Sequence, residues 1–570
     1  MGTNIVSGDV KVLWDQDTGL VAGYVDRNGD EQPVLGSSAA IAAAALAGSW
    51  GVASKYFFRV DGTAATLSAC VGPETDAAQC GNAALLASSK IPPGSSVYLS
   101  IEGGSWSGLT LTGDKISGAS PDMPVNLYFD AGRYNSTASN AWILYLDGGV
   151  TPVENLRVYD LWGECTYVAG LSEAVCSLKG TVGYASADSV KFIRCRARCL
   201  GGDGFSQLSG AGKGTVEYID CDAIDCGSAH VKTESDQGYT AHNVGQVAIL
   251  IRSNATNCNE SVSFVGGSIC DWRSGSSTGA LNCHAKADSG GTVKIGAGVT
   301  INQNNTSSAL FNLPVSGAAS AIRVNGATVN VTAHSATPSY IYGQLSVSGG
   351  AWTVNSSSAS INVLASGSIS FERASLAMTN FTRFLSSVGS TAATINFRRN
   401  KVNLAGASDA GSTRNIVYYT GGCNGDVSAN EWTELGSDVS RVQIEADAGA
   451  ITANHNTVYQ AVNSGTGTWM QDKKVAGVPS VNNIFFNVPY PYYGAGSALQ
   501  KNYSCFINSG SAVGANSITT DPLFAAAPTD YRLGSSSPSK TAGTASSTAA
   551  DVCGISFHAT TPSLGANQHV

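Results

Sequence analysis

Short runs of alternating apolar and polar residues recur along most of the chain, and turn-forming residues separate them. Runs such as NLRVYDLWG, SVKFIRC, TVEYIDC and QVAILIRS combine β-branched and aromatic residues, which are typical of strands. Asn, Asp, Gly and Ser stand at the ends of these runs, as they do in tight turns. The pattern predicts an all-β protein built from many short strands.

Three central segments align with one another and indicate an internal repeat. The segments FIRCRARCLGGDGF, YIDCDAIDCGSAHV and LIRSNATNCNESVS place Cys195, Cys221 and Ser253 in one column, at spacings of 26 and 32 residues. Close to a second column lie Cys199, Cys226 and Cys258. A repeat with loop insertions of variable length is typical of a solenoid. We predict a right-handed parallel β-helix with the first column pointing into its core.

The composition supports strands over helices. Only 13% of the 570 residues are Asp, Glu, Lys or Arg, about half the usual share. Surface helices depend on Glu, Lys, Gln and Arg, whereas the 66 glycines favour tight turns.

Charge and hydropathy exclude two classes of partner. The formal net charge of -9 disfavours nucleic acid, because phosphate binding needs a basic surface. No apolar run reaches the ~18 residues that a membrane-spanning helix requires. The start, MGTNIVSGDVKVLW, lacks the pattern of a signal peptide. Export by another route and prior removal of a signal both remain open.

The pattern divides the chain into four parts. Residues 1–36 alternate Val and Leu between the turns DTG and DRNGD, which predicts a small β module. Residues 37–94 form a connector, with a short Ala-rich helix, and the cap that opens the β-helix. Residues 95–535 form the β-helix itself, and residues 536–570 form its closing coil and tail.

The 14 cysteines fit a narrow core better than a metal site. No short Cys pair has a matching His or Cys pair, so zinc is not expected. The central cysteines are predicted to be small buried residues. Cys70 with Cys80, and Cys165 with Cys176, each flank a loop and are candidates for disulfides. Their redox state stays open.

Two stretches carry a family resemblance. The run IPPGSSVYLSIEGGSW…SGLTLTG…MPVNLYFDAG resembles the opening coils of pectate-lyase-like right-handed β-helix proteins that act on polysaccharides. The run TTDPLFAAAPTDYRLGSSSPSKTAGT…TPSLGANQ resembles their closing coils, although Lys540 stands where that group often has an apolar residue. The likeness covers about three quarters of the chain and is most similar to bacteriophage tailspike and tail-fibre depolymerases. It implies the fold more than the activity, since this scaffold hosts lyases, hydrolases, epimerases and plain binding proteins.

Ionisable residues concentrate between residues 194 and 252. The segment DQGYTAH resembles a DG[FY]-T-x-H segment in a central coil of related enzymes, with Gln237 as an extra residue. The candidate catalytic residues are Asp236, His242, Glu234 and Asp203. The candidate substrate-binding residues are His230, Lys232, Tyr239, Arg252 and Trp162.

Two reactions could use this cluster. Hydrolysis needs paired carboxylates, one of them protonated, and Asp203, Asp225, Glu234 and Asp236 supply candidates. β-Elimination from a uronic acid needs a base and a cation, for which His242, His230, Lys232 and Arg252 are candidates. A purely structural alternative has Asp203 and Asp225 closing turns, and Tyr239 and Trp162 packed in the core.

These observations favour a phage tail protein that binds, and cleaves, a bacterial surface polysaccharide. Such a protein would be a homotrimer on the virion, attached to other tail proteins through residues 1–36. A secreted bacterial lyase or hydrolase, and a non-enzymatic structural or adhesive β-helix, are the alternatives. No cofactor is expected, and Ca²⁺ held by Asp and backbone oxygens is left open.

Overall fold

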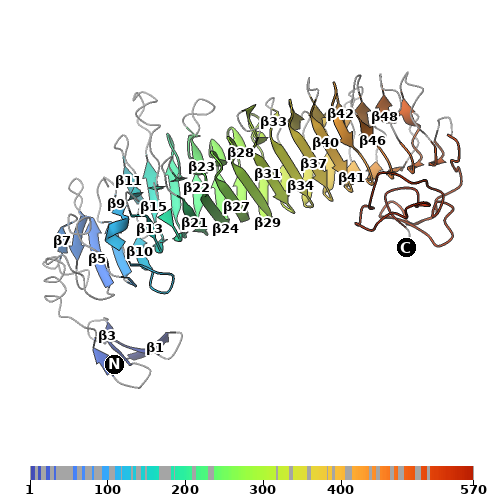
Figure 1. Cartoon of the computed structure of the whole chain (residues 1–570). Coiled ribbons are helices and arrows are strands. Elements are labelled where there is room, and N and C mark those ends of the chain that lie inside the picture. Colours follow the sequence, from blue (N-terminus) through green and yellow to red (C-terminus); the bar gives the residue numbers. More distant parts are fainter. Residues whose placement is uncertain are drawn as a thin grey trace.

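The protein is a long stack of three-stranded coils, seen from the side in Figure 1. The computed structural model describes residues 2–6, 10–14, 21–25, 31–33, 55–60, 67–70, 80–82, 91, 93–94, 96–101, 109–116, 118–129, 133–136, 143–147, 151–165, 182–184, 187–207, 213–228, 236–315, 319–332, 338–355, 361–379, 381, 383–387, 392–404, 414–434, 440–444, 450–461, 468–472, 480–493, 502–509 and 514–568.

Most coils contribute one strand to each of three parallel faces, which we name sheets a, b and c in chain order. Sheet a contains β8 (Ser96–Ile101), β10 (Val125–Phe129), β14 (Leu156–Tyr159), β18 (Val190–Ile193), β21 (Gly214–Ile219), β24 (Gln246–Ile251), the first halves of β27 (Ile269–Thr278) and β29 (Thr292–Gln303), β31 (Ala321–Asn325), β34 (Gln344–Ser348), β37 (Ser368–Glu372), β40 (Thr394–Arg398), β43 (Asn424–Asp426) and β46 (Ile451–Thr452). Sheet b contains β11 (Arg133–Ser136), β15 (Trp162–Cys165), β19 (Arg196–Cys199), β22 (Asp222–Ile224), β25 (Ser253–Thr256), the second halves of β27 and β29, β32 (Thr328–Val331), β35 (Ala351–Asn355), β38 (Ser375–Thr379), β41 (Lys401–Leu404), β44 (Glu431–Glu434), β47 (Thr457–Gln460), β49 (Ile484–Phe486) and β51 (Cys505–Ile507).

Sheet c lies along the upper side of the stack in Figure 1. It consists of two parallel sheets that follow one another along the stack, with an isolated bridge between Leu313 and Ile341 where they meet. The first contains β9 (Leu109–Thr112), β12 (Leu144–Asp147), β16 (Val182–Tyr184), β20 (Phe205–Gln207), β23 (Gln237–Ala241), β26 (Glu260–Phe264), β28 (Cys283–Ala287) and β30 (Ala309–Asn312). The second contains β33 (Ser339–Ile341), β36 (Ile361–Val363), β39 (Arg383–Ser387), β42 (Arg414–Tyr419), β45 (Ser440–Ile444), β48 (Thr468–Asp472) and β50 (Tyr490–Tyr493). The predicted all-β parallel β-helix is therefore confirmed.

The period of two along each strand builds the core. In β14, Leu156 and Val158 are buried whereas Arg157 and Tyr159 are partly exposed. Because the strands pair in parallel and in register, apolar residues of successive coils lie on one another. Val158 thus lies between Leu127 and Phe192 of the neighbouring coils. Repeated along the axis, this stacking gives one continuous apolar core.

The corner between sheets a and b turns on residues in the left-handed backbone region. Asp220 and Arg252 occupy this corner in successive coils, with φ angles of 55° and 49°. The residue after the turn points inward, so Cys195, Cys221 and Ser253 form one fully buried row. The Ser253 Oγ accepts a hydrogen bond from the Cys221 N–H at 3.2 Å. The predicted inward row is confirmed.

Later coils fill the same row with asparagine. Asn400, Asn430, Asn456 and Asn483 are buried and follow one another in register. Each of the first three donates its backbone N–H to the side-chain oxygen of the next, at 2.9, 3.2 and 2.8 Å. The ladder satisfies backbone groups that the corner leaves without partners in the core.

The second cysteine column is also buried but is shifted in part. Cys226 and Cys258 occupy the same register position on neighbouring coils. Cys199 pairs with Cys165 and lies one register position before Cys226. Burial raises the pKa of the Cys226 thiol well above its usual value. These thiols are packing residues, as predicted.

The front of the chain adds a small separate sheet. The strands β1 (Gly2–Val6), β2 (Val10–Trp14), β3 (Val21–Val25) and β4 (Glu31–Pro33) pair in antiparallel order, outside the stack (Figure 1). Strand β5 (Lys55–Val60) pairs parallel with β8 and antiparallel with β6 (Leu67–Cys70), which pairs with β7 (Cys80–Asn82). The expected helix within 37–50, and Cys176, lie outside the described residues. The four-part division of the chain stays a prediction.

The C-terminal residues fold back over the last coils. The strands β52 (Phe524–Ala526) and β53 (Asp530–Leu533) form a hairpin. The Tyr531 and Thr433 hydroxyls lie 2.6 Å apart, and Asn567 donates to the Glu431 carboxylate at 2.7 Å. This segment therefore covers the outer face of sheet b from β44 onward. Within the described part of the chain, no helix is long and apolar enough to cross a membrane.

Candidate functional site

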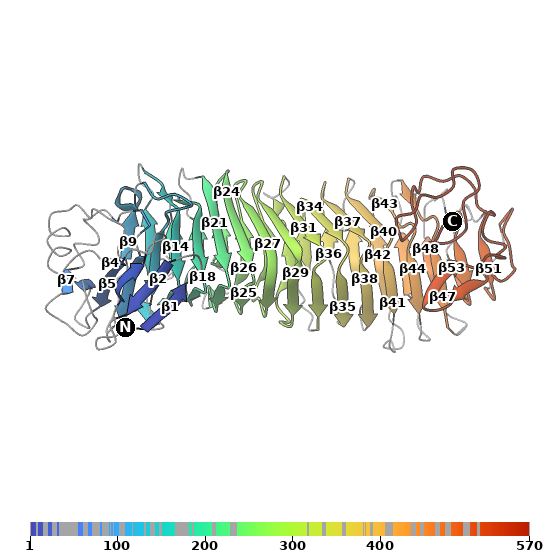
Figure 2. The same ribbon diagram turned by 90° about the horizontal axis from the view of Figure 1, so that it is seen from below.

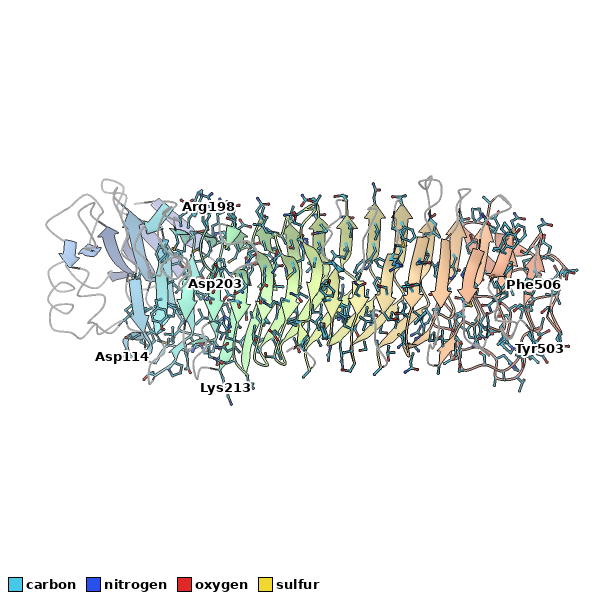
Figure 3. The ribbon with its side chains drawn as sticks, turned by 90° about the horizontal axis from the view of Figure 1, so that it is seen from above. Asp114, Arg198, Asp203, Lys213, Tyr503 and Phe506 are labelled. Atoms are coloured by element: carbon cyan, nitrogen blue, oxygen red, sulfur yellow. The ribbon has the colours of Figure 1, made fainter. Side chains whose placement is uncertain are left out.

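A ladder of polar side chains crosses successive coils where the strands of sheet c begin. Asp203 lies just before β20, Gln237 begins β23, and Glu260 begins β26. Asp203 Oδ1 accepts a hydrogen bond from the Gln237 backbone N–H at 2.9 Å. The Gln237 side-chain amide donates to Glu260 Oε2 at 3.2 Å. Gln237 thus connects two carboxyl groups, and Figure 3 looks onto this face with Asp203 labelled.

Glu260 is tied to the next coil as well. Its carboxylate is 1% exposed, and its Oε1 atom accepts from Lys286 Nζ at 3.0 Å and from the Asn282 amide at 3.2 Å. A buried charge of this kind is tolerable only when it is paired and hydrogen-bonded. The ladder therefore holds a carboxylate and an ammonium group in fixed positions on sheet c.

The environment of Asp203 favours its protonated form. Burial raises the pKa of this carboxyl to about 6, against the lowering effect of its hydrogen bonds, and the Glu260 carboxylate raises it further. Asp203 is nevertheless partly accessible. A carboxylic acid that keeps its proton near pH 6 can donate it to a leaving group.

Lys286 and His242 lie along the same sheet. Burial opposes the charge on Lys286, but the Glu260 carboxylate outweighs this, so the pKa of Lys286 is raised. Burial and the Lys286 charge together lower the pKa of His242. His242 Nε2 lies 3.3 Å from the Thr240 hydroxyl, which is in register with Ser206 and Ser263 on the neighbouring strands.

Asp236 and His242 stand at opposite ends of β23. Asp236 precedes the strand and His242 follows it, so their Cα atoms are about 20 Å apart at ~3.3 Å per residue. Asp236 is 6% exposed and lies against the turn at Gly227. The two residues therefore cannot act on one bond as an acid and a base in this arrangement. Asp236 directly precedes Gln237 of the ladder, and His242 is close enough to Lys286 to feel its charge.

Three predicted substrate-binding residues do not contribute to the accessible face of sheet c. Tyr239 lies on β23 but is fully buried, stacks on Phe205 at 5.1 Å and donates to the Cys221 carbonyl at 3.0 Å, which fits the core-packing alternative for this residue. Arg252 lies at the corner between sheets a and b and binds Asp220 through two hydrogen bonds. Trp162 lies on sheet b under the Arg196 guanidinium, 5.3 Å from the ring centre.

The remaining candidates divide into turn residues and residues not described. Asp225 has a φ of 52° and accepts from Arg198 Nε at 2.9 Å, which fits the turn role that was one of its two interpretations. Glu234, His230 and Lys232 lie outside the described residues, so their place relative to the ladder stays a prediction.

Sequence reasoning missed Gln237 as a bridge, and missed Glu260 and Lys286. Glu260 stands in the aligned segment LIRSNATNCNESVS, two residues after Cys258. Aligning the three repeat segments as far as the start of each sheet c strand would have placed Glu260 in line with Asp203. Lys286 carried no such signal, because it contacts Glu260 from three residues inside β28.

Comparison with known proteins adds no family to this picture. No protein-family model matches the sequence, and no curated protein matches it. Among the described residues, no group of three or more His, Cys, Asp and Glu side chains is placed to hold a metal ion.

Proposed function

We propose that this protein binds and hydrolyses a bacterial surface polysaccharide, in the manner of a phage tailspike or tail fibre. The observation that supports this most is the ladder from Asp203 through Gln237 and Glu260 to Lys286. It gathers ionisable groups on one sheet of a chain in which only 13% of residues are charged. A β-helix offers such groups in straight rows, which suit an extended polymer.

In this proposal Asp203 is the general acid. Its protonated carboxyl donates a proton to the glycosidic oxygen as the bond to the anomeric carbon breaks. Glu260, which lies 3.0 Å from Lys286 Nζ, is the carboxylate that takes a proton from the attacking water. One strand separates the strands of Asp203 and Glu260, so their backbones are about 10 Å apart. This spacing is nearer to that of inverting than of retaining glycosidases, whose carboxyl groups lie ~6.5–9.5 Å and ~5 Å apart.

β-Elimination is the second candidate, and one observation favours it. The lowered pKa of His242 leaves its imidazole neutral at pH 7, as a base must be, and Lys286 is close enough to contribute to that lowering. A uronic-acid carboxylate near Lys286 would be required for this reaction.

The proposed biological setting is the tail of a bacteriophage. The small sheet β1–β4 ahead of the coils suits attachment to other virion tail proteins, and the resemblance of the opening and closing coils points to phage depolymerases. A secreted bacterial enzyme would use the same site. An adhesive β-helix would bind the polymer without cutting it.

A panel of purified bacterial capsules and O-antigens tests the proposal. Hydrolysis releases reducing ends without unsaturated sugars, whereas β-elimination yields an unsaturated uronate that absorbs in the ultraviolet. We expect reducing ends alone, with a rate that falls as the pH rises above about 6, because Asp203 then loses its proton. Removing the imidazole by His242→Ala should cost little under hydrolysis but ~10²–10⁴-fold under elimination.

If the protein binds members of the panel but cleaves none of them, it is an adhesive protein and the proposal of an enzyme is rejected.

A further inference from the structure

The outer face of sheet b carries no charge over six consecutive coils, from β25 to β38. One outer row comprises Asn254, Ser276, Thr300, Thr328, Ala351 and Ser375. The next outer row comprises Thr256, Thr278, Asn302, Asn330, Thr353 and Ala377. We call these twelve residues the neutral face. Figure 2 shows strands of sheet b, among them β25, β35 and β38, along one edge of the stack.

The neutral face is accessible and regular. Four of its residues are exposed and the other eight are partly exposed, while the residues between them point into the core. Parallel pairing in register spaces its side chains by about 4.8 Å along the axis and by about 6.7 Å along each strand.

Sheet a has a different outer face in the same coils. Asp271, Lys294 and Arg323 follow one another in register there. The neutral face itself ends at charged residues, with Asp222 in line before Asn254 and Lys401 in line after Ser375. The outer face of sheet b is therefore uncharged in these coils, whereas sheet a carries a charged residue in at least three of them.

Hydrogen bonds between coils hold the neutral face in place. Asn302 donates to the Thr278 hydroxyl at 3.2 Å, and Asn330 donates to the Asn302 side-chain oxygen at 2.9 Å. Ser276 donates to the Asn254 side-chain oxygen at 2.9 Å. An amide has two donors and two acceptor sites, so each asparagine keeps capacity for a ligand. Side chains ordered in advance lose less entropy on binding.

We infer that the neutral face binds a linear, uncharged polysaccharide along the axis of the β-helix. Hydroxyl and amide groups pair with sugar hydroxyls, and the absence of charge spares an uncharged polymer from burying unpaired ions. The inference rests on the proposed function in taking a glycan as the ligand. It also narrows that function, because a polymer without carboxylates can be hydrolysed but not cleaved by β-elimination.

Two features of the molecule support a ligand on this face. Further along sheet b the chain's own C-terminal segment already occupies the outer face, where Tyr531 meets Thr433 and Tyr459. The neutral face is the uncovered continuation of that contact surface. A second copy of the chain is a poor fit, because the face has no aromatic, Met or Arg residue to form the centre of a protein interface.

The test measures binding of neutral and acidic polysaccharides by affinity electrophoresis, with capsules and O-antigens sorted by charge. Thr353→Glu places a carboxylate on the exposed neutral face. Ser346→Glu is the matched control, because Ser346 is equally an exposed outward residue of the same coil, but on β34 of sheet a. We expect a neutral polymer to retard the protein, with an affinity at least about tenfold weaker for Thr353→Glu and nearly unchanged for Ser346→Glu.

Retardation by acidic polymers only would overturn this inference and leave the proposed function standing. Equal losses in the two variants would also overturn it, because binding would then not depend on the neutral face. If no polymer of either kind retards the protein, the inference and the proposed function fail together.

Discussion

Two histidines are buried in places where a charge would have no counterion. His284 lies between the Ser277 hydroxyl, 2.5 Å from Nδ1, and the Gln303 side chain, and burial lowers its pKa to about 4. His455 stacks on Phe557 at 3.8 Å, and burial lowers its pKa to about 3. Both must be neutral in the folded protein.

These histidines predict a loss of stability in acid. Below pH 6.5 the unfolded chain binds protons that folded His284 and His455 do not, so stability falls as the pH drops toward about 4. Each histidine contributes up to ~1.4 kcal/mol per pH unit in that window. The melting temperature should therefore fall between pH 6.5 and 4, and less steeply in His284→Gln. The exposed His558→Gln is the control, and an unchanged slope in His284→Gln would contradict this explanation.

Single residues show where sequence reasoning works and where it stops. The row of Cys195, Cys221 and Ser253 could be predicted, because the repeat aligns residues of similar size and polarity. The position of Tyr239 could not, because every residue of β23 is buried and its alternation is hidden. The contact between Glu260 and Lys286 depends on a long side chain reaching across coils, which no spacing reveals.

The asparagine ladder is the element on which the later coils depend most clearly. Asn430 accepts from the Asn400 backbone N–H at 2.9 Å, and its own amide donates to the Phe397 carbonyl at 2.8 Å. Its loss leaves these buried groups without partners, at a cost of about 1–3 kcal/mol each.

Asn430→Ala should therefore lower the melting temperature by several degrees or more. Asn403→Ala, on the exposed outer side of β41, should lower it little. Thermal unfolding followed by circular dichroism compares the two variants. Similar melting temperatures for both would show that the ladder does not stabilise the stack.

At the level of elements, the strands were easier to predict than their assignment to sheets. Alternating polarity and turn residues marked most strands. Which of the three sheets a strand joins, however, depends on its register with the neighbouring coils. That register is set by insertions of variable length, which have no fixed period in the sequence. For this reason the shared position of Asp203 and Glu260 on sheet c, and the displacement of Arg252 and Trp162 from it, required the structure.

The whole molecule is expected to be a homotrimer. Ile193, Ile219 and Ile251 form a partly exposed apolar row on the outer side of sheet a, in register over three coils. Apolar rows on a soluble protein are suited to contact between copies. Light scattering at micromolar concentration should give three times the chain mass of 58.2 kDa. A stable monomer would contradict the expectation and favour a secreted enzyme.

The proposed hydrolysis depends on Asp203 acting as an acid, and the cleavage rate of Asp203→Asn tests this role most directly. The measurement is the initial rate of reducing-end release from a polysaccharide that the unmodified protein cleaves, with Asp220→Asn as the control. Asp220→Asn removes the same negative charge at the corner between sheets a and b. Asparagine can adopt the φ of 55° that Asp220 has there.

We predict a loss of ~10²–10⁴-fold for Asp203→Asn and nearly full activity for Asp220→Asn. The melting temperature of Asp203→Asn at pH 7 should not fall, because burial disfavours the charge that the substitution removes. An Asp203→Asn protein that keeps more than about a tenth of the activity would contradict the account.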